Sequence, residues 1–120
     1  MAKLIGHLFT SDTKQFTTFE VDGLKETPKQ FTKTAESEKF IPKQEYRFWS
    51  IMPKKQLGQI KEDYGFLNEK SFTMYDTADN TPLFKKLVVN VLRERAAAAK
   101  TKYENISAML ESAESALLGE

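Results

Sequence analysis

The last third of the chain carries an apolar repeat that only a long helix can place on one side. Its residues recur at alternating steps of four and three: Leu92, Ala96, Ala99, Tyr103, Ile106, Leu110, Ala113 and Leu117. A 3.5-residue period is typical of a helix packed along a partner. The stretch ERAAAAK (94–100) has strong helix propensity, and Gly119 stands where a helix should end. We therefore expect a helix from about Glu94 to Leu118.

The length of this helix limits what can cover it. A straight helix of about 25 residues is about 37 Å long. Strands of about 5–6 residues span only about 17–20 Å, so a small sheet would cover roughly half of the repeat. The repeat therefore predicts self-association through residues 94–118. The alternative is that it lies on the chain's own sheet and needs no second subunit.

Several short stretches upstream are typical of β-strands. Alternating or β-branched residues occupy 3–9, 15–21, 29–36, 45–52 and 70–76. Asp22-Gly23 predicts a turn, 37–44 a loop, and 77–82 another turn. Pro53 should end the strand expected at 45–52, because proline cannot donate a ladder hydrogen bond. It should also open a short helix, because Leu57, Ile60 and Tyr64 then recur at helical spacing. Strands without long crossovers predict a small antiparallel barrel.

Residues 83–92 fit two structures. A helical stripe would contain Leu83, Phe84, Leu87, Val88, Val91 and Leu92, and Thr81-Pro82 is a good helix start. The β-branched stretch LVVNV also alternates as a strand would. A single helix from Thr81 to Leu118 would run 38 residues, which is long for a globular domain.

Composition narrows the class of protein. The chain has 120 residues, 40% of them hydrophobic and 29% charged, which predicts an ordinary globular protein. It has no cysteine, and neither a signal peptide nor a membrane span is recognisable, so we expect a cytoplasmic protein. His7 is the only histidine, so we expect no metal site and no cofactor. We find no catalytic constellation and expect a protein that is not an enzyme.

Charge is distributed unevenly along the chain. Residues 27–55 contain seven basic and three acidic side chains, a balance of +4, although the whole chain carries only +1. Aromatic residues are interleaved with these cations. Single-stranded nucleic acid is held by such a combination of basic groove and stacking aromatics, at about 1–3 kcal/mol per stacked base. The stretch YRFW (46–49) is its densest part.

Strand alternation divides this stretch between two faces. Arg47 and Trp49 share one face, and Tyr46 and Phe48 share the other. Because arginine resists burial, alternation favours Arg47 and Trp49 as the outward pair. The alternative is that Trp49 packs in the core.

Five segments also occur in a recognisable order: LIGHL (4–8), FTKTAESE (31–38), EYRFWSIM (45–52), QLGQIKEDYGFLNEKSFTMYD (56–76) and KKLVVNVL (85–92). In this order the chain resembles bacterial and phage single-stranded-DNA-binding proteins of the OB-fold type (the SSB type). The segments are similar to that family's first three strands, its short helix with the fourth strand, and its fifth strand. The resemblance thus favours a strand at 85–92.

The resemblance implies a five-stranded OB-type barrel over residues 1–93, with a short helix between strands 3 and 4. A long C-terminal helix (94–120) would pack on the barrel or on a second subunit. The implied function is single-strand binding and protection in DNA replication and recombination, as a homo-oligomeric dimer or tetramer with replication or recombination proteins as further partners. By the resemblance, the family's stacking aromatic falls on Tyr46 or Phe48 and its basic partner on Arg47. Alternation instead favours Trp49, so the sequence does not decide which aromatic side chains face the nucleic acid.

Bacterial members end in a disordered acidic tail, whereas this chain ends ESAESALLGE within a helix. A phage protein, in the host cytoplasm, therefore fits better. The alternative function is a phage-type inhibitor or adaptor that binds a host protein through the basic-aromatic face. The full candidate nucleic-acid-binding set is Lys33, Lys39, Phe40, Lys43, Tyr46, Arg47, Phe48, Trp49, Phe72, Tyr75, Lys85 and Lys86.

Overall fold

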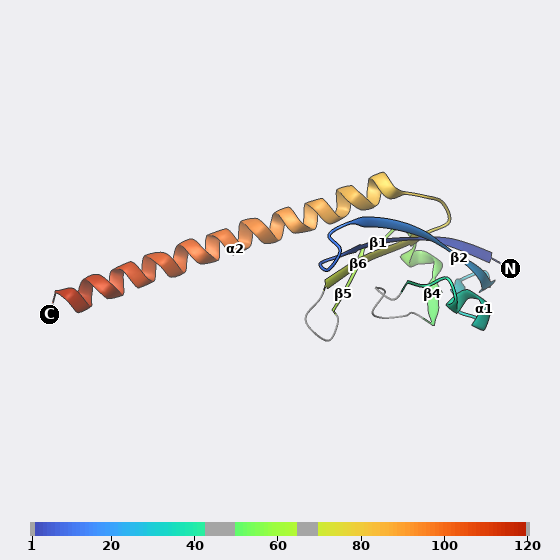
Figure 1. The fold of residues 1–120 in the computed structure, drawn as a ribbon, viewed down its shortest axis with the longest axis horizontal. Helices are drawn as coiled ribbons and strands as arrows, with labels where there is room; N and C mark the ends of the chain where they lie inside the picture. The colour runs from blue at the N-terminus through green and yellow to red at the C-terminus, as the bar shows by residue number, and fades with distance from the viewer. Residues whose placement is uncertain (1, 43–49, 65–69, 120) are drawn as a thin grey trace. The chain divides into compact units, whose positions relative to one another are not determined.

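The protein contains a single curled antiparallel sheet with one long helix (Figure 1). The computed structural model describes residues 2–42, 50–64 and 70–119. Six strands pair in the order β4-β3-β2-β1-β6-β5, and the sheet curls into half a barrel. The strands are β1 (Ala2–Thr10), β2 (Phe16–Glu26), β3 (Gln30–Thr32), β4 (Ile51–Pro53), β5 (Lys61–Tyr64) and β6 (Lys70–Asp76). The helices are α1 (Ala35–Glu38), the 3-10 turn η1 (Lys54–Gln56) and α2 (Thr81–Leu118).

This architecture confirms a curved antiparallel sheet with a C-terminal helix and corrects its details. The strands expected at 3–9 and 70–76 are present as β1 and β6, and the strand before Pro53 ends there as β4. Within the described ranges, the sheet has six strands rather than the expected five. The expected strand at 29–36 is only three residues long, because Thr34 and Ser37 cap each other and start α1.

The segment 54–64 is not the short helix that its apolar spacing predicts. Only the turn η1 is helical, and Lys61–Tyr64 instead pair with β6 as β5. Gly58 has φ of 75°, a left-handed conformation that a right-handed helix cannot contain. Its N–H donates to the carbonyl oxygen of Tyr75 at 2.8 Å, so a tertiary hydrogen bond replaces a helical one.

Asp22-Gly23 forms a bulge inside β2 instead of a turn. Ala2 faces Leu24 and Leu4 faces Val21, so β2 has one residue more than β1 between these pairs. Gly23 takes φ of 76°, which glycine adopts without steric cost. Beyond the bulge, β2 pairs with β3 at Lys25 and Glu26. One long strand therefore serves both parts of the curled sheet.

Apolar side chains cover both faces of the central strands. On the interior of the curl lies one cluster: Leu4, Val21, Leu24, Phe31, Met52 and Tyr75. On the other face, the first two turns of α2 bury Phe84 and Val88, and the Phe84 ring lies against the rings of His7 on β1 and Phe16 on β2. Burying each of these two side chains is worth about 1.5–3 kcal/mol.

A buried histidine joins this second face. His7 Nδ1 lies 2.9 Å from the carbonyl oxygen of Met74 on β6, and the N–H of Asn80 lies 2.9 Å from His7 Nε2. A carbonyl can only accept and an amide can only donate, so Nδ1 carries the proton and Nε2 accepts. The ring also lies 5.6 Å from that of Phe84. His7 thus links β1, β6 and the residue that precedes α2.

Residues 85–92 are helical, which corrects the strand that the family resemblance favours. The carboxylate of Asp79 accepts hydrogen bonds from the N–H and hydroxyl of Thr81 at the helix start. These two hydrogen bonds lower the pKa of Asp79 below its ordinary value of 3.8, the hydroxyl contributing most. Burial of Phe84 and Val88, four residues apart, outweighs the modest helix propensity of the valines.

The chain divides into two compact units, Met1–Val88 and Val89–Glu120. The division falls inside α2, whose first eight residues belong to the first unit. Val89–Leu118 are helical throughout, and nearly all of their side chains are exposed. In the described ranges, no helix has the length and apolar composition that crossing a bilayer requires.

Replacing His7 tests its linking role. In His7→Leu, the Met74 carbonyl and the Asn80 N–H both lose their partner, and each loss costs about 1–3 kcal/mol when no water replaces it. We expect the free energy of unfolding in urea to fall by about 2–5 kcal/mol. The control Thr18→Ala removes an exposed hydroxyl pair with Thr81 and should change stability by less than about 0.5 kcal/mol. Equal stability of His7→Leu and the wild type would contradict the assignment.

Candidate nucleic-acid interface

The structure describes seven of the twelve candidate binding residues. The other five lie outside the described residues: Lys43, Tyr46, Arg47, Phe48 and Trp49. The choice between Trp49 and the Tyr46–Phe48 pair as the stacking face therefore stays a prediction. The described seven fall in three separate places along the fold.

The first place is the segment around α1, which contains Lys33, Lys39 and Phe40. Thr34 and Ser37 form a capping box: the Ser37 N–H donates to Thr34 Oγ1 at 3.1 Å, and the Thr34 N–H donates to Ser37 Oγ at 2.8 Å. The Thr34 hydroxyl in turn donates to the Gly23 carbonyl at 2.6 Å. The bulge of β2 therefore holds the start of α1 in place, and α1 in turn determines where Lys39 and Phe40 lie.

Lysines in this segment have carboxylate neighbours. Lys33 Nζ lies 3.7 Å from Glu38, and Lys39 Nζ lies 3.9 Å from Glu36. On β4's side, the Lys54 ammonium is 2.6 Å from Glu26 and 5.4 Å from the centre of the Phe31 ring. Exposed pairs of this kind are worth about 0–1 kcal/mol, so a phosphate can replace the carboxylate at little cost.

Phe40 is the exposed aromatic of the segment, with 44% of its surface accessible. It follows Lys39 directly, and its N–H donates to the Ser37 carbonyl at 3.1 Å. Across the short β3–β4 pair, Ile51 is also half exposed. The described residues 29–42 and 50–55 contain five lysines and two glutamates, so this part of the surface is cationic.

Phe72 and Tyr75, the second place, do not form a stacking surface. Both are 3% exposed, so neither ring offers a face to a base. They are also three residues apart on β6, and strand alternation sends them to opposite faces. Tyr75 joins the interior cluster, whereas Phe72 pairs with Phe9 in the β1–β6 ladder. Their aromatic type and strand position suited binding, but burial on both faces of β6 places them in the core.

Lys85 and Lys86, the third place, are exposed on the first turns of α2. The Lys85 ammonium lies 5.6 Å from the centre of the Phe16 ring, at the start of β2. Lys33 follows the residue that pairs with Lys25, near the end of β2. Lys25 lies nine positions after Phe16 in β2, about 30 Å along the strand. These two lysines therefore do not join the surface around α1.

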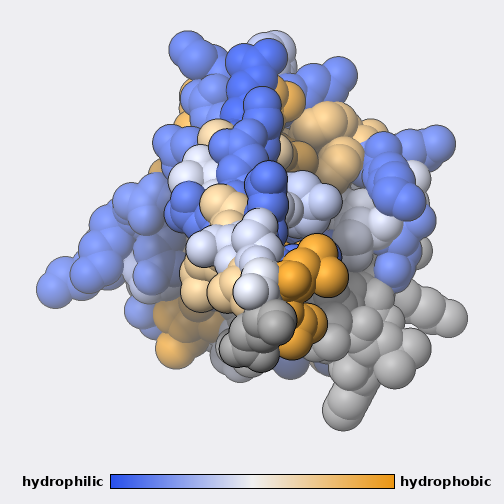
Figure 2. Space-filling model, turned by 90° about the vertical axis from the view of Figure 1, so that its left-hand side faces the viewer, coloured by the Kyte–Doolittle hydropathy of each residue, from blue (hydrophilic) through white to orange (hydrophobic). Residues whose placement is uncertain are grey.

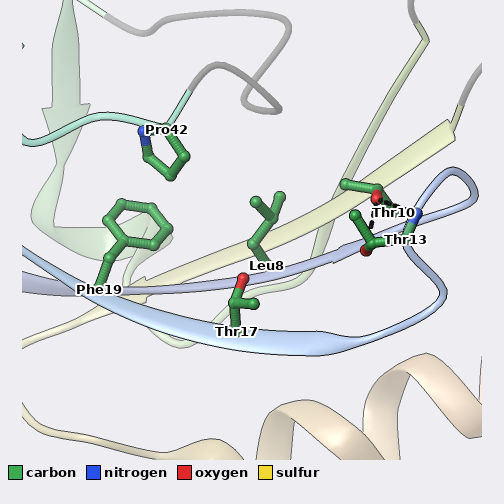
Figure 3. A pocket seen from close by; sticks show the side chains of 6 residues that line it. All are labelled: Leu8, Thr10, Thr13, Thr17, Phe19 and Pro42. Atoms are coloured by element: carbon green, nitrogen blue, oxygen red, sulfur yellow. Dashed lines mark hydrogen bonds between the residues drawn. The ribbon is translucent and has the colours of Figure 1, made fainter.

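A hollow on the interior of the curl was not apparent from the sequence (Figure 3). Leu8, Phe19 and Pro42 supply its apolar lining, and the remaining lining residues are Thr10, Thr13 and Thr17. Its volume is about 230 Å³. Pro42, which follows α1, faces the Phe19 ring and Leu8 across the hollow (Figure 3). The segment that carries Lys39 and Phe40 thus leads directly onto the concave face of the sheet.

The Phe19 ring lies over Gly6. A Cβ atom on Gly6 would come within 2.3 Å of Phe19 Cζ, closer than any real contact. The ring also meets Tyr75 edge-on, with centres 5.9 Å apart and planes at 85°. The absence of a side chain at Gly6 therefore sets the position of the ring that lines the hollow. Only the paired strands reveal this requirement, because Gly6 and Phe19 are 13 residues apart.

Comparison of the chain with known protein families, with characterised proteins and with solved structures gives no significant match. The described residues contain no group of three or more histidine or carboxylate side chains placed to hold a metal ion.

Substituting Gly6 tests the position of the Phe19 ring. Alanine in a strand would ordinarily stabilise a protein by up to about 1 kcal/mol, but here it must displace the ring, at a cost of about 1–3 kcal/mol. In a Phe19→Ala background that cost should vanish. The measurement is a double-mutant cycle on the free energy of unfolding. Additive effects of the two substitutions would show that the ring does not rest on Gly6.

Proposed function

We propose that the protein binds single-stranded nucleic acid through the surface around α1 and is not an enzyme. One observation carries the proposal: Phe40 is exposed beside Lys39 on a segment whose Pro42 borders the concave face of the sheet. A base stacked on Phe40 would have lysine ammonium groups near its phosphates. Stacking needs no particular base, so binding is sequence-tolerant.

The lysine pairs explain how the surface would take up a phosphate chain. Lys33 and Lys39 are held beside Glu38 and Glu36 in the free protein. Binding exchanges these weak pairs for pairs with phosphates and releases the counterions condensed on the strand. The proposed binding set also includes the candidate residues that follow Pro42 in the sequence: Lys43, Tyr46, Arg47, Phe48 and Trp49.

The proposal retains the functional class implied by the resemblance to OB-fold single-stranded-DNA-binding proteins. It covers protection of single strands in replication or recombination, a phage origin, the host cytoplasm as location, and a homo-oligomeric state. The curled sheet with a basic segment at its concave side is compatible with this class. The helical conformation of residues 85–92 departs from it, because the family's fifth strand would lie there.

A second candidate is an adaptor or inhibitor that binds another protein through the same surface. Two half-exposed apolar side chains, Phe40 and Ile51, favour it, since apolar anchors with paired charges at the rim are typical of protein interfaces. Titration with single-stranded and duplex DNA distinguishes the two. An adaptor would show no preference for single-stranded over duplex DNA, because it would not stack on bases.

The Phe40 ring provides the direct test. Titrating the fluorescence of the single tryptophan with oligo-dT should show binding that Phe40→Ala weakens by about 1–3 kcal/mol. A matched control is Leu83→Ala, which removes a side chain of similar exposure (43%) from α2. It should bind as the wild type does. Equal affinity for duplex and oligo-dT would contradict stacking, because paired bases have no free face.

Salt dependence tests the lysines separately. With about 3–5 phosphates neutralised, the slope of log K against log salt should be about −2 to −4. Glu36→Gln and Glu38→Gln free Lys39 and Lys33 from their carboxylate neighbours, so the double variant should bind more tightly at low salt. A flat salt response, or weaker binding by the double variant, would show that these lysines do not meet phosphates.

A further inference from the structure

The apolar repeat of α2, here called the seam, lies along one side of the helix in the second unit. It consists of eight residues: Leu92, Ala96, Ala99, Tyr103, Ile106, Leu110, Ala113 and Leu117. The large ones, which are Leu92, Tyr103, Ile106, Leu110 and Leu117, are 40–71% exposed. Hydrophobic side chains appear at the molecular surface in Figure 2, where the C-terminal end of α2 faces the viewer. A strict alternation of three- and four-residue steps is the pattern of a coiled coil. The seam therefore has the spacing to receive another helix.

Charge divides this part of the helix into two halves. Residues 89–103 carry four basic side chains and Glu94, a balance of +3. Residues 104–119 carry Glu104, Glu111 and Glu114 and no basic side chain, a balance of −3. The change of sign falls between Tyr103 and Glu104, one residue before the midpoint of the seam, which lies between residues 104 and 105. The helix is thus complementary to its own reversed copy.

We propose that α2 pairs antiparallel with α2 of a second copy of this chain, centred between residues 104 and 105. In this register Tyr103 meets the partner's Ile106, and Leu92 meets the partner's Leu117. Ala96 meets the partner's Ala113, where two small side chains let the backbones approach closely. Every apolar residue of the seam faces an apolar residue, and the +3 half lies along the −3 half.

The flanking residues decide between the two directions. In heptad terms, Arg93, Arg95, Lys100 and Lys102 all occupy positions beside the seam. A parallel pair would set Arg95 against the partner's Lys100, once on each side, and would gather eight cations along one half. The antiparallel pair sets Lys100 against the partner's Glu114, twice. Like charges that face each other are unfavourable and opposite charges favourable, so the antiparallel direction is preferred.

Charge reversal at Lys100 distinguishes antiparallel from parallel pairing, because the two arrangements predict opposite changes in the dissociation constant of the dimer. Sedimentation equilibrium of the full chain should show a dimer, and Lys100→Glu should raise its dissociation constant about five- to tenfold by facing the partner's Glu114. Lys100→Glu with Glu114→Lys should restore it. The control Thr101→Glu places a carboxylate at the neighbouring outward position, a change of one charge rather than two, and should leave the dissociation constant close to that of the wild type. A parallel pair predicts the opposite sign, because Lys100→Glu would then meet the partner's Arg95.

A distance measurement checks the register. The chain has no cysteine, so Ser115→Cys carries a single spin label at an exposed outward position. In the antiparallel register the two labelled positions are 21 residues apart along the helices, about 32 Å. A parallel pair would place them side by side, with helix axes about 8–10 Å apart.

With the protein alone, each of three outcomes would overturn the proposal: a monomer at tens of micromolar, a tighter dimer of Lys100→Glu, or a label distance near that of a parallel pair. Dimerisation only on addition of DNA or another protein would overturn it as well. The inference does not rest on nucleic-acid binding. A dimer that ignores oligo-dT would contradict the proposed function alone, and a monomer that binds it would contradict the pairing alone.

Discussion

Two hydrogen bonds to the buried ring of His7 connect the parts of the first unit. The imidazole donates to β6 through the Met74 carbonyl and accepts from the Asn80 N–H just before α2. A neutral imidazole supplies one donor and one acceptor on opposite sides of a compact ring, and both are needed here. The burial of Phe84 against His7 of β1 and Phe16 of β2 depends on this start of α2 being in place. The helix would otherwise leave that face of the sheet in water.

Local sequence predicted those elements whose pattern and packing agree. β1 and β6 follow from their alternation, and the helix from about Glu94 follows from its propensity. The segment after Pro53 was mispredicted because the left-handed turn at Gly58 and pairing with β6 decide its structure. Residues 85–92 fit two periods, and burial of Phe84 and Val88 selects the helix. The bulge at Asp22-Gly23 resembles a turn until its partner strand is known.

In the candidate site, too, some features follow from local sequence and others only from tertiary contacts. The exposure of Lys39 and Phe40 could be expected from sequence, because a basic residue beside an aromatic in a predicted loop is a local feature. Phe72 and Tyr75 are also aromatic but lie in a strand buried on both faces. The hollow beneath Pro42 could not be found, since Gly6, Phe19 and Pro42 meet only when the sheet has curled. The bulge of β2 and the capping box of α1 jointly determine where that segment lies.

The division of the chain inside α2 has a consequence for how its sequence can drift. Residues 81–88 are held by contacts to the sheet, so most substitutions there act on the folding of the first unit. Residues 89–118 pack against little of their own unit, and a stretch of alanines maintains their helix. Under the proposed pairing of α2, mutations in this part would be selected against through loss of association more than through misfolding. The two parts of one continuous helix can therefore accumulate substitutions at different rates, with the boundary between Val88 and Val89, where the helical backbone is uninterrupted.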